Sequence, residues 1–189
     1  MEQEIKFPKR KPTRAKNFDY NSSGAYFITI CTKDRRPILS NIVGTGVLDC
    51  PKIELTEYGE IVEKYIKKMT LFYDNISIEK YVIMPNHVHI LLLLRNHERG
   101  NLCNGQSGTP VPTNIARANS VFSRFVSTLK RFCNKECGTN IWQARSNDHI
   151  IRNQEDYARH LRYICENPSC WYYDELCIEE EKASFLLQT

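Results

Sequence analysis

The chain has 189 residues, of which 41% are hydrophobic and 25% charged, and its net charge is +4. This length and balance suit one globular domain with tails, and they exclude a fibrous or wholly disordered chain. No apolar run approaches the roughly 18 residues that a membrane-spanning helix needs, and the charged N-terminus lacks the apolar segment of a secretory signal. We therefore expect a cytoplasmic protein whose eight cysteines are free thiols.

Basic residues are concentrated at the N-terminus. Residues 1–16 carry six basic and two acidic side chains, a surplus of four that equals the net charge of the whole chain. Pro8 and Pro12 oppose helix formation, so we expect residues 1–22 to form a basic flexible arm. Such an arm favours a polyanionic partner contacted through its phosphates, although a solvated tail would have the same composition.

The rest of the sequence predicts alternating strands and helices. Runs of β-branched and aromatic residues indicate strands, and apolar residues spaced three and four apart indicate helices. Ser120 and Asn153 are placed to cap two helices, and Gly138 is placed to end one. In chain order we predict a strand over 25–32, a helix over 53–69, strands over 76–84 and 87–95, a helix over 120–138, a strand over 141–152 and a helix over 154–167.

The order β-α-β-β-α-β is that of the ferredoxin-like fold, an antiparallel sheet with two helices on one face. We therefore predict an α+β protein of this class, with one helix added after the last strand. Residues 23–168 would form this domain and residues 169–189 a C-terminal tail. The loop over 96–117, rich in Gly, Pro and Asn, is longer than this fold needs.

Two histidines begin the strand predicted over 87–95. Side chains alternate across a strand, so His87 and His89 should point to the same face, about 7 Å apart. Two imidazoles on one face could bind one divalent ion and leave coordination positions open for substrate and water. Pro85 and Asn86 place the pair at the start of the strand, where we expect a sheet edge that substrate can reach. A structural histidine pair would give the same pattern.

The last predicted helix offers a second pair of polar side chains. Tyr163 and Asn167 are four residues apart and therefore lie on one helix face. Asn167 could offer an oxygen to a metal ion, and Tyr163 could attack a phosphorus atom as a phenolate. A phenol has a pKa near 10, so this attack needs a metal or base that favours deprotonation. Alternatively, Tyr163 is a core residue and Asn167 belongs to the helix exit.

Polar and basic residues also interrupt the strand predicted over 141–152. Arg145, Asp148, His149 and Arg152 stand where a buried strand would be apolar. A strand that lines a polyanion-binding groove would carry such residues, and so would an edge strand.

Taken in order, these motifs resemble those of the REP-associated tyrosine transposases, single-tyrosine HUH transposases of bacterial insertion sequences. The resemblance runs from about residue 14 to 175, and its ordered set of motifs is specific where the histidine pair alone is not. The matching segments are GAYFITICTKDRRPIL, MPNHVHILL, IWQ, HIIRN, YICENP and NPSCWYYDEL.

This resemblance implies a metal-dependent enzyme that nicks and rejoins single-stranded DNA. His87 and His89 would form the HUH motif and bind Mg²⁺ or Mn²⁺ together with Asn167. Tyr163 would attack a phosphodiester, form a covalent 5′-phosphotyrosine linkage and release a 3′-OH. Related insertion-sequence transposases commonly carry Gln at the position of Asn167, whereas Asn matches the REP-associated branch.

The resemblance further implies an imperfect DNA hairpin as substrate and a bacterial, nucleoid-associated location. Relatives act as monomers or as dimers that exchange the tyrosine helix, which leaves a homodimer open. Phe18 and Tyr20 are candidates to stack on bases, and His149 could instead be structural or assist proton transfer. The residues predicted to bind DNA are Lys9, Arg10, Lys11, Arg14, Lys130, Arg131, Arg145, His149 and Arg152.

Two other functions fit the sequence. The first is a domesticated protein that binds hairpin DNA without cutting it. The second is an interaction module stabilised by zinc on the cysteines, although their spacing matches no CxxC pair.

Overall fold

A computed structural model of the chain describes residues 18–44, 51–95 and 120–178. The strands are β1 (Gly24–Cys31), β2 (Ser40–Val43), β3 (Lys52–Leu55), β4 (Ile76–Ile83), β5 (His87–Leu94) and β6 (Asn147–Ile150). The α-helices are α1 (Glu57–Phe72), α3 (Val121–Glu136) and α4 (Gln154–Glu166), and single 3-10 turns span Lys33–Arg35 and Trp171–Tyr173. Within these ranges, none of the helices has the length and apolar character needed to cross a bilayer.

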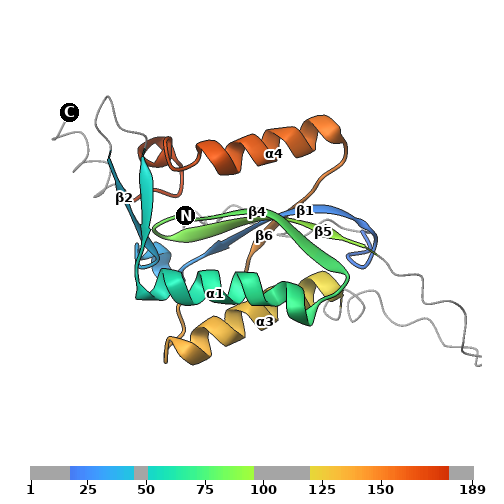
Figure 1. Ribbon diagram of the computed structural model, residues 1–189, viewed down its shortest axis with the longest axis horizontal. Helices are drawn as coiled ribbons and strands as arrows, with labels where there is room; N and C mark the ends of the chain where they lie inside the picture. The colour runs from blue at the N-terminus through green and yellow to red at the C-terminus, as the bar shows by residue number, and fades with distance from the viewer. Residues whose placement is uncertain (1–17, 45–50, 96–119, 179–189) are drawn as a thin grey trace, which may run out of the picture.

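Four strands form one antiparallel sheet in the order β4-β5-β1-β6. This is the strand order of the ferredoxin-like fold, so the predicted fold class is confirmed. Helices α1 and α3 cover one face of the sheet, and the added helix α4 covers the other (Figure 1). β1 and β5 are the two inner strands and pair along their whole length, from Gly24 opposite Leu94 to Cys31 opposite His87.

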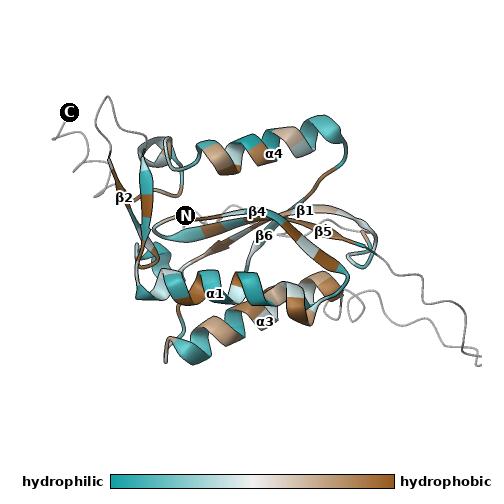
Figure 2. Ribbon diagram, viewed as in Figure 1, coloured by the Kyte–Doolittle hydropathy of each residue, from teal (hydrophilic) through white to brown (hydrophobic). Residues whose placement is uncertain are grey.

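Alternation along the inner strands divides the interior into two layers. Tyr26, Ile28 and Ile30 of β1 enter the larger core beneath α1 and α3. Phe27 faces the other way, into a smaller apolar cluster beneath α4 that includes Leu91 of β5. Helices α1 and α4 show hydrophilic and hydrophobic residues side by side, as expected of helices with one buried face (Figure 2).

The predicted helix caps are confirmed, and they explain where the helices begin. The side chains of Ser120 and Asn153 accept hydrogen bonds from the first turns of α3 and α4. Gly138 follows the end of α3 with a φ of 67°, a backbone conformation that glycine adopts without strain. The helix predicted from residue 53 instead begins at Glu57, because Thr56 caps it.

Three predictions need correction. Residues 40–43, where no element was predicted, and residues 52–55, where a helix was predicted from residue 53, form the two-stranded sheet of β2 and β3. The strand predicted over 141–152 is regular only from Asn147 to Ile150. The histidine pair lies at the start of a strand, as predicted, but that strand is interior and not at a sheet edge.

Residues 18–22, the last part of the predicted arm, lie against the folded body. Tyr20 is buried, and its hydroxyl donates a 2.6 Å hydrogen bond to Asp148 Oδ2. The ring of Phe18 packs edge-on against that of Tyr20, with centroids 5.2 Å apart. The prediction that Tyr20 stacks on bases is therefore wrong, because its ring is enclosed. Lys9, Arg10, Lys11 and Arg14 and the loop 96–117 lie outside the described residues.

Candidate active site

Helix α4 brings a tyrosine and an asparagine over the start of β5. Its apolar side chains, which include Ile164, pack with Phe27 and Trp171 in the smaller cluster. Full burial of an Ile side chain contributes about 1.5–3 kcal/mol, so this contact helps to fix the helix on the sheet. Tyr163 of the same helix has its ring beside that of His89. Asn167 follows one turn later and is buried.

His87 and His89 lie on one face of the sheet, with ring centroids 4.4 Å apart. Both side chains are buried, at 0% and 2% exposure. His87 Nδ1 lies 2.9 Å from the amide oxygen of Asn86, and His89 Nδ1 lies 2.9 Å from the hydroxyl of Thr29. These bonds fix the orientation of both rings through their Nδ1 atoms and leave both Nε2 atoms available.

Three buried polar atoms at this site have no hydrogen-bond partner among the described residues. They are Nε2 of His87, Nε2 of His89 and Oδ1 of Asn167. A buried polar atom without a partner costs about 1–3 kcal/mol, so these three atoms are candidates to bind a ligand. Two imidazole nitrogens and an amide oxygen are suitable ligands for a divalent cation, and the residues present therefore fit the metal that the sequence predicted.

Burial keeps both imidazoles in the neutral form that can bind a metal. It lowers the pKa of His87 to about 3, and the nearby positive charge of Arg35 acts in the same direction. Burial also places the pKa of His89 well below its usual value, and the neighbouring His87 contributes to that shift.

The Tyr163 hydroxyl donates a 3.0 Å hydrogen bond to Asp174 Oδ2. Its ring centroid lies 5.1 Å from that of His89, and the side chain is 41% exposed. Partial burial raises the pKa of the phenol well above 10, and the charge and hydrogen bond of Asp174 raise it further. In this arrangement the phenol is held in its protonated form.

Asp174 is a site residue that the sequence did not reveal. Its Oδ2 accepts hydrogen bonds from both the Tyr163 hydroxyl and Asn167 Nδ2, each 3.0 Å long. The aspartate follows the 3-10 turn Trp171–Tyr173, and the ring of Trp171 lies 5.8 Å from that of His87. Residues after 168, predicted as a tail, therefore contribute directly to the site. Only their place within the segment NPSCWYYDEL signalled them.

A cavity of about 600 Å³ gives access to the site. His89 and Tyr163 line it from the sheet and from α4, Asp174 lines it from the segment after α4, and Arg159 and His160 line it further along the helix. The histidine pair is therefore buried but not sealed, because one of its members borders this cavity.

No protein-family model matches the chain. A Haemophilus influenzae protein provisionally assigned as a REP-associated tyrosine transposase is 28% identical over 172 residues, which cover 88% of this chain and 82% of that protein. The REP-associated tyrosine transposase of Escherichia coli is 30% identical over 93 residues, which cover 49% of this chain and 44% of that protein. Over most of its length the chain is therefore similar in sequence to a protein provisionally assigned as a REP-associated tyrosine transposase, and over half of its length to a REP-associated tyrosine transposase.

A solved structure of a REP-associated tyrosine transposase bound to a REP hairpin has the same fold as this chain. The TM-score is 0.55 at 23% identity, and the match covers 84% of this chain and 73% of that chain.

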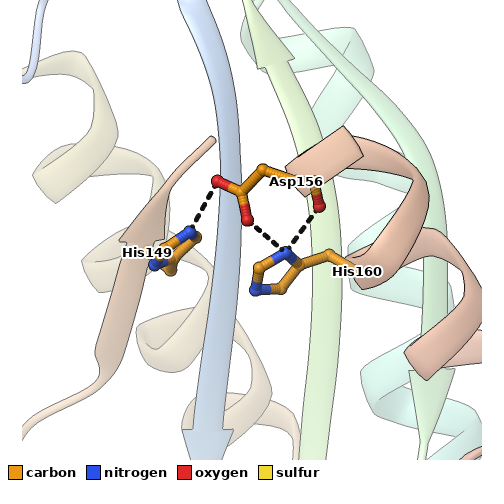
Figure 3. A group of neighbouring side chains, drawn as sticks. All are labelled: His149, Asp156 and His160. Carbon is orange, nitrogen blue, oxygen red and sulfur yellow. Dashed lines mark hydrogen bonds and ion pairs between the residues drawn. The ribbon is translucent and has the colours of Figure 1, made fainter. Parts of the chain in front are cut away.

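The chain has a second group of side chains that could hold a metal ion, formed by His149 of β6 with Asp156 and His160 of α4 (Figure 3). Their ligand atoms lie within 4.8 Å of one another. Here the facing atoms are already paired: His149 Nε2 lies 2.8 Å from Asp156 Oδ2, and His160 Nδ1 lies 2.8 Å from the Asp156 carbonyl oxygen. The described cysteines are all free and form no comparable group.

Among the described residues, those predicted to bind DNA fall in two places. Lys130 and Arg131 belong to α3, across the sheet from α4, and Arg145 lines a cavity of about 280 Å³ beside Lys130 (Figure 1). His149 and Arg152 instead lie near the start of α4, where both bond to Asp156, Arg152 through its backbone N–H.

Lys130 has little freedom to contact a phosphate. Its Nζ donates to the carbonyl oxygens of Gln143, Ala144 and Arg145, and burial lowers its pKa to about 8. A phosphate would have to replace one of these carbonyls, so its DNA-binding role stays a prediction.

Proposed function

We propose that the chain is a metal-dependent enzyme that nicks and rejoins single-stranded DNA at a hairpin through a covalent 5′-phosphotyrosine intermediate. The observation that carries the proposal is the set of three buried ligand atoms without partners beside Tyr163. His87, His89 and Asn167 would hold Mg²⁺ or Mn²⁺. A bound divalent ion supplies charge that polarises a phosphodiester and stabilises the charge developing on it.

Tyr163 is the proposed nucleophile. Its phenolic oxygen forms a bond to phosphorus while the bond from phosphorus to the 3′ oxygen breaks, which leaves the 5′ phosphate on the tyrosine and a free 3′-OH. Asp174 already accepts the phenol hydrogen bond and is placed to take its proton. Attack by a 3′-OH on the phosphotyrosine reverses the step, so strands are rejoined without an external energy source.

The position of Asp174 in the site also affects the boundary of the proposed domain. We propose the predicted catalytic domain 23–168 together with the segment to residue 178, because that segment supplies Asp174 to the site. A hairpin partner is proposed by analogy, since a related transposase has been solved bound to a REP hairpin.

A denaturing gel tests this function. The full chain is incubated with labelled single-stranded hairpin DNA from the flanks of its own gene, in Mn²⁺, in Mg²⁺ and in EDTA. We expect a covalent adduct that needs the metal, is absent in Tyr163→Phe and persists in Tyr173→Phe, a matched control at an exposed tyrosine that lines the same cavity. Hairpin binding without any adduct would instead favour the binding-only function.

A further inference from the structure

Helix α4 carries a polar stripe beside its apolar one. Asp156, His160, Tyr163 and Asn167 follow one another at spacings of four, three and four residues, and so lie along one side of the helix. Asp156 and Asn167 are buried, at 5% and 2% exposure. Polar side chains facing a sheet are costly unless they are paired or used, and only the Tyr163 and Asn167 end is used in the proposed reaction.

Asp156 organises the other end of this stripe. Its Oδ1 accepts a 2.6 Å hydrogen bond from Arg159 and lies 3.2 Å from His160 Nδ1, and its Oδ2 accepts from the backbone N–H of Arg152. The ring of His149 stacks on that of His160, with centroids 4.5 Å apart. Burial would raise the pKa of Asp156, but the hydrogen bonds outweigh it and hold the pKa below its usual value.

Some nitrogen atoms of His160 and Arg159 are not used in the bonds to Asp156. His160 Nδ1 is occupied by Asp156, while its Nε2 has no partner among the described residues. Arg159 uses one of its five N–H donors on Asp156, and its side chain is 67% exposed. Both residues line the same cavity as Tyr163. Because both partners of His160 Nδ1 are oxygens, Nδ1 is the donor there, and Nε2 donates as well when the ring is an imidazolium. The free donors of the Arg159 guanidinium and Nε2 of that imidazolium both suit a phosphate oxygen.

Charge is divided along the cavity. Asp174 and Glu175 line it near Tyr163, beside the proposed metal ligands, whereas Arg159 and His160 line it toward the start of α4. Arg159 precedes Tyr163 by four residues, about 6 Å along the helix axis. That offset is comparable with the separation of successive phosphates in an extended single strand.

We propose that Arg159 and His160 bind a phosphodiester of single-stranded DNA next to the one that Tyr163 attacks, with Asp156 as the residue that positions both. This assignment rests on the proposed function and extends it to side chains outside the tyrosine and metal ligands. A metal ion in the group of Figure 3 is the less favoured use, because it would have to displace the Arg159 and Arg152 hydrogen bonds to Asp156.

Fluorescence anisotropy with the full chain tests the proposal. The probe is a fluorescein-labelled single-stranded hairpin oligonucleotide from the flanks of the gene, titrated at several NaCl concentrations in EDTA so that no cleavage occurs. We expect Arg159→Ala to weaken binding about tenfold and to reduce the slope of log K against log [NaCl] by about 0.7, the loss of one phosphate contact. Arg159→Lys should restore most of that slope.

Arg162→Ala is the matched control, since Arg162 is exposed on the same helix and does not line the cavity. Equal affinities and slopes for Arg159→Ala and Arg162→Ala would overturn the proposal. Asp156→Asn distinguishes the positioning of Arg159 and His160 from a simple effect of the protein's net charge. Removal of a negative charge should tighten DNA binding if only net charge matters, whereas the positioning role predicts weaker binding. If Asp156→Asn does not fold, the Arg159 variants still decide.

The outcomes separate this proposal from the proposed function. If the unaltered protein forms the covalent adduct but Arg159→Ala binds the hairpin with unchanged affinity, only the phosphate site is overturned. Weaker binding by Arg159→Ala with no adduct in the unaltered protein would support the phosphate site and remove the cleavage function. No DNA binding at low salt would overturn both. One equivalent of Zn²⁺ bound by His87→Ala protein and lost on His149→Ala would assign the group to a metal and overturn the proposal.

Discussion

Acidification should destabilise the metal-free protein, with His87 as a main cause. Its imidazole is fully buried, and its pKa falls from 6.5 to about 3 on folding, through burial and then the charge of Arg35. Between pH 6.5 and pH 3 the unfolded chain binds a proton at His87 that the folded chain excludes. The free energy of unfolding therefore decreases as the pH is lowered. The stability is fully present above about pH 7 and is lost progressively as the pH falls below 6.5 toward 3.

The size of the effect follows from the same shift. At pH 5 the medium is about 1.5 units below the unfolded pKa, and each unit corresponds to 1.36 kcal/mol. His87 alone should therefore remove about 2 kcal/mol of unfolding free energy between pH 8 and pH 5. The lowered pKa of His89 acts in the same direction. Asp156 acts only below its usual pKa of 3.8 and does not contribute in this range.

Urea unfolding in EDTA at pH 8, 7, 6 and 5, followed by tryptophan fluorescence, measures this loss. His87→Gln keeps a neutral polar side chain but cannot titrate, so its unfolding free energy should fall by about 2 kcal/mol less than that of the unaltered protein over the same range. Equal losses in the two proteins would refute the reasoning, because they would show that His87 gains its proton without unfolding.

Three further outcomes are expected. Mn²⁺ should raise the urea midpoint of the unaltered protein in proportion to the logarithm of its concentration and leave that of His87→Ala unchanged; an equal rise in both would place the ion elsewhere. Gly59→Ala should cost about 1–3 kcal/mol in the same assay, because a Cβ there would collide with the Leu39 backbone oxygen, and an unchanged midpoint would contradict this. Asp174→Asn should slow adduct formation at neutral pH on the denaturing gel, because it removes the carboxylate that is placed to take the Tyr163 proton, and an unaltered rate would show that Asp174 is not the base.

Local rules predicted the elements that are long and strongly patterned. The caps at Ser120 and Asn153 and the alternation through His87 and His89 follow from contacts between residues close in sequence. β2 and β3 escaped prediction because each has four residues and becomes a strand only by pairing with the other. Their register is a property of two segments, and neither segment shows it alone.

The candidate site divides in the same way. Residue types and spacing suggested His87, His89, Tyr163 and Asn167, and their roles stay predictions. Asp174 could not be predicted from spacing, because it reaches Tyr163 only after the chain turns back beyond α4. The donors of Lys130 were likewise unpredictable, since the carbonyl groups that they meet come from a loop whose path depends on the whole fold.

The pairing of β1 with β5 has a consequence for how this site can fail. Thr29 stands opposite His89, and Cys31 stands opposite His87, in the register that also sends Val88 and Ile90 into the larger core. A shift of β5 by one residue would bury both imidazoles under α1 and α3 and expose their apolar neighbours to α4. The positions of His87 and His89 are therefore fixed by the same strand pairing that forms the sheet. A variant that keeps this register keeps both histidine positions on the face of the sheet beneath α4, so the separation of the ligands can change without unfolding only through α4 or the segment that follows it.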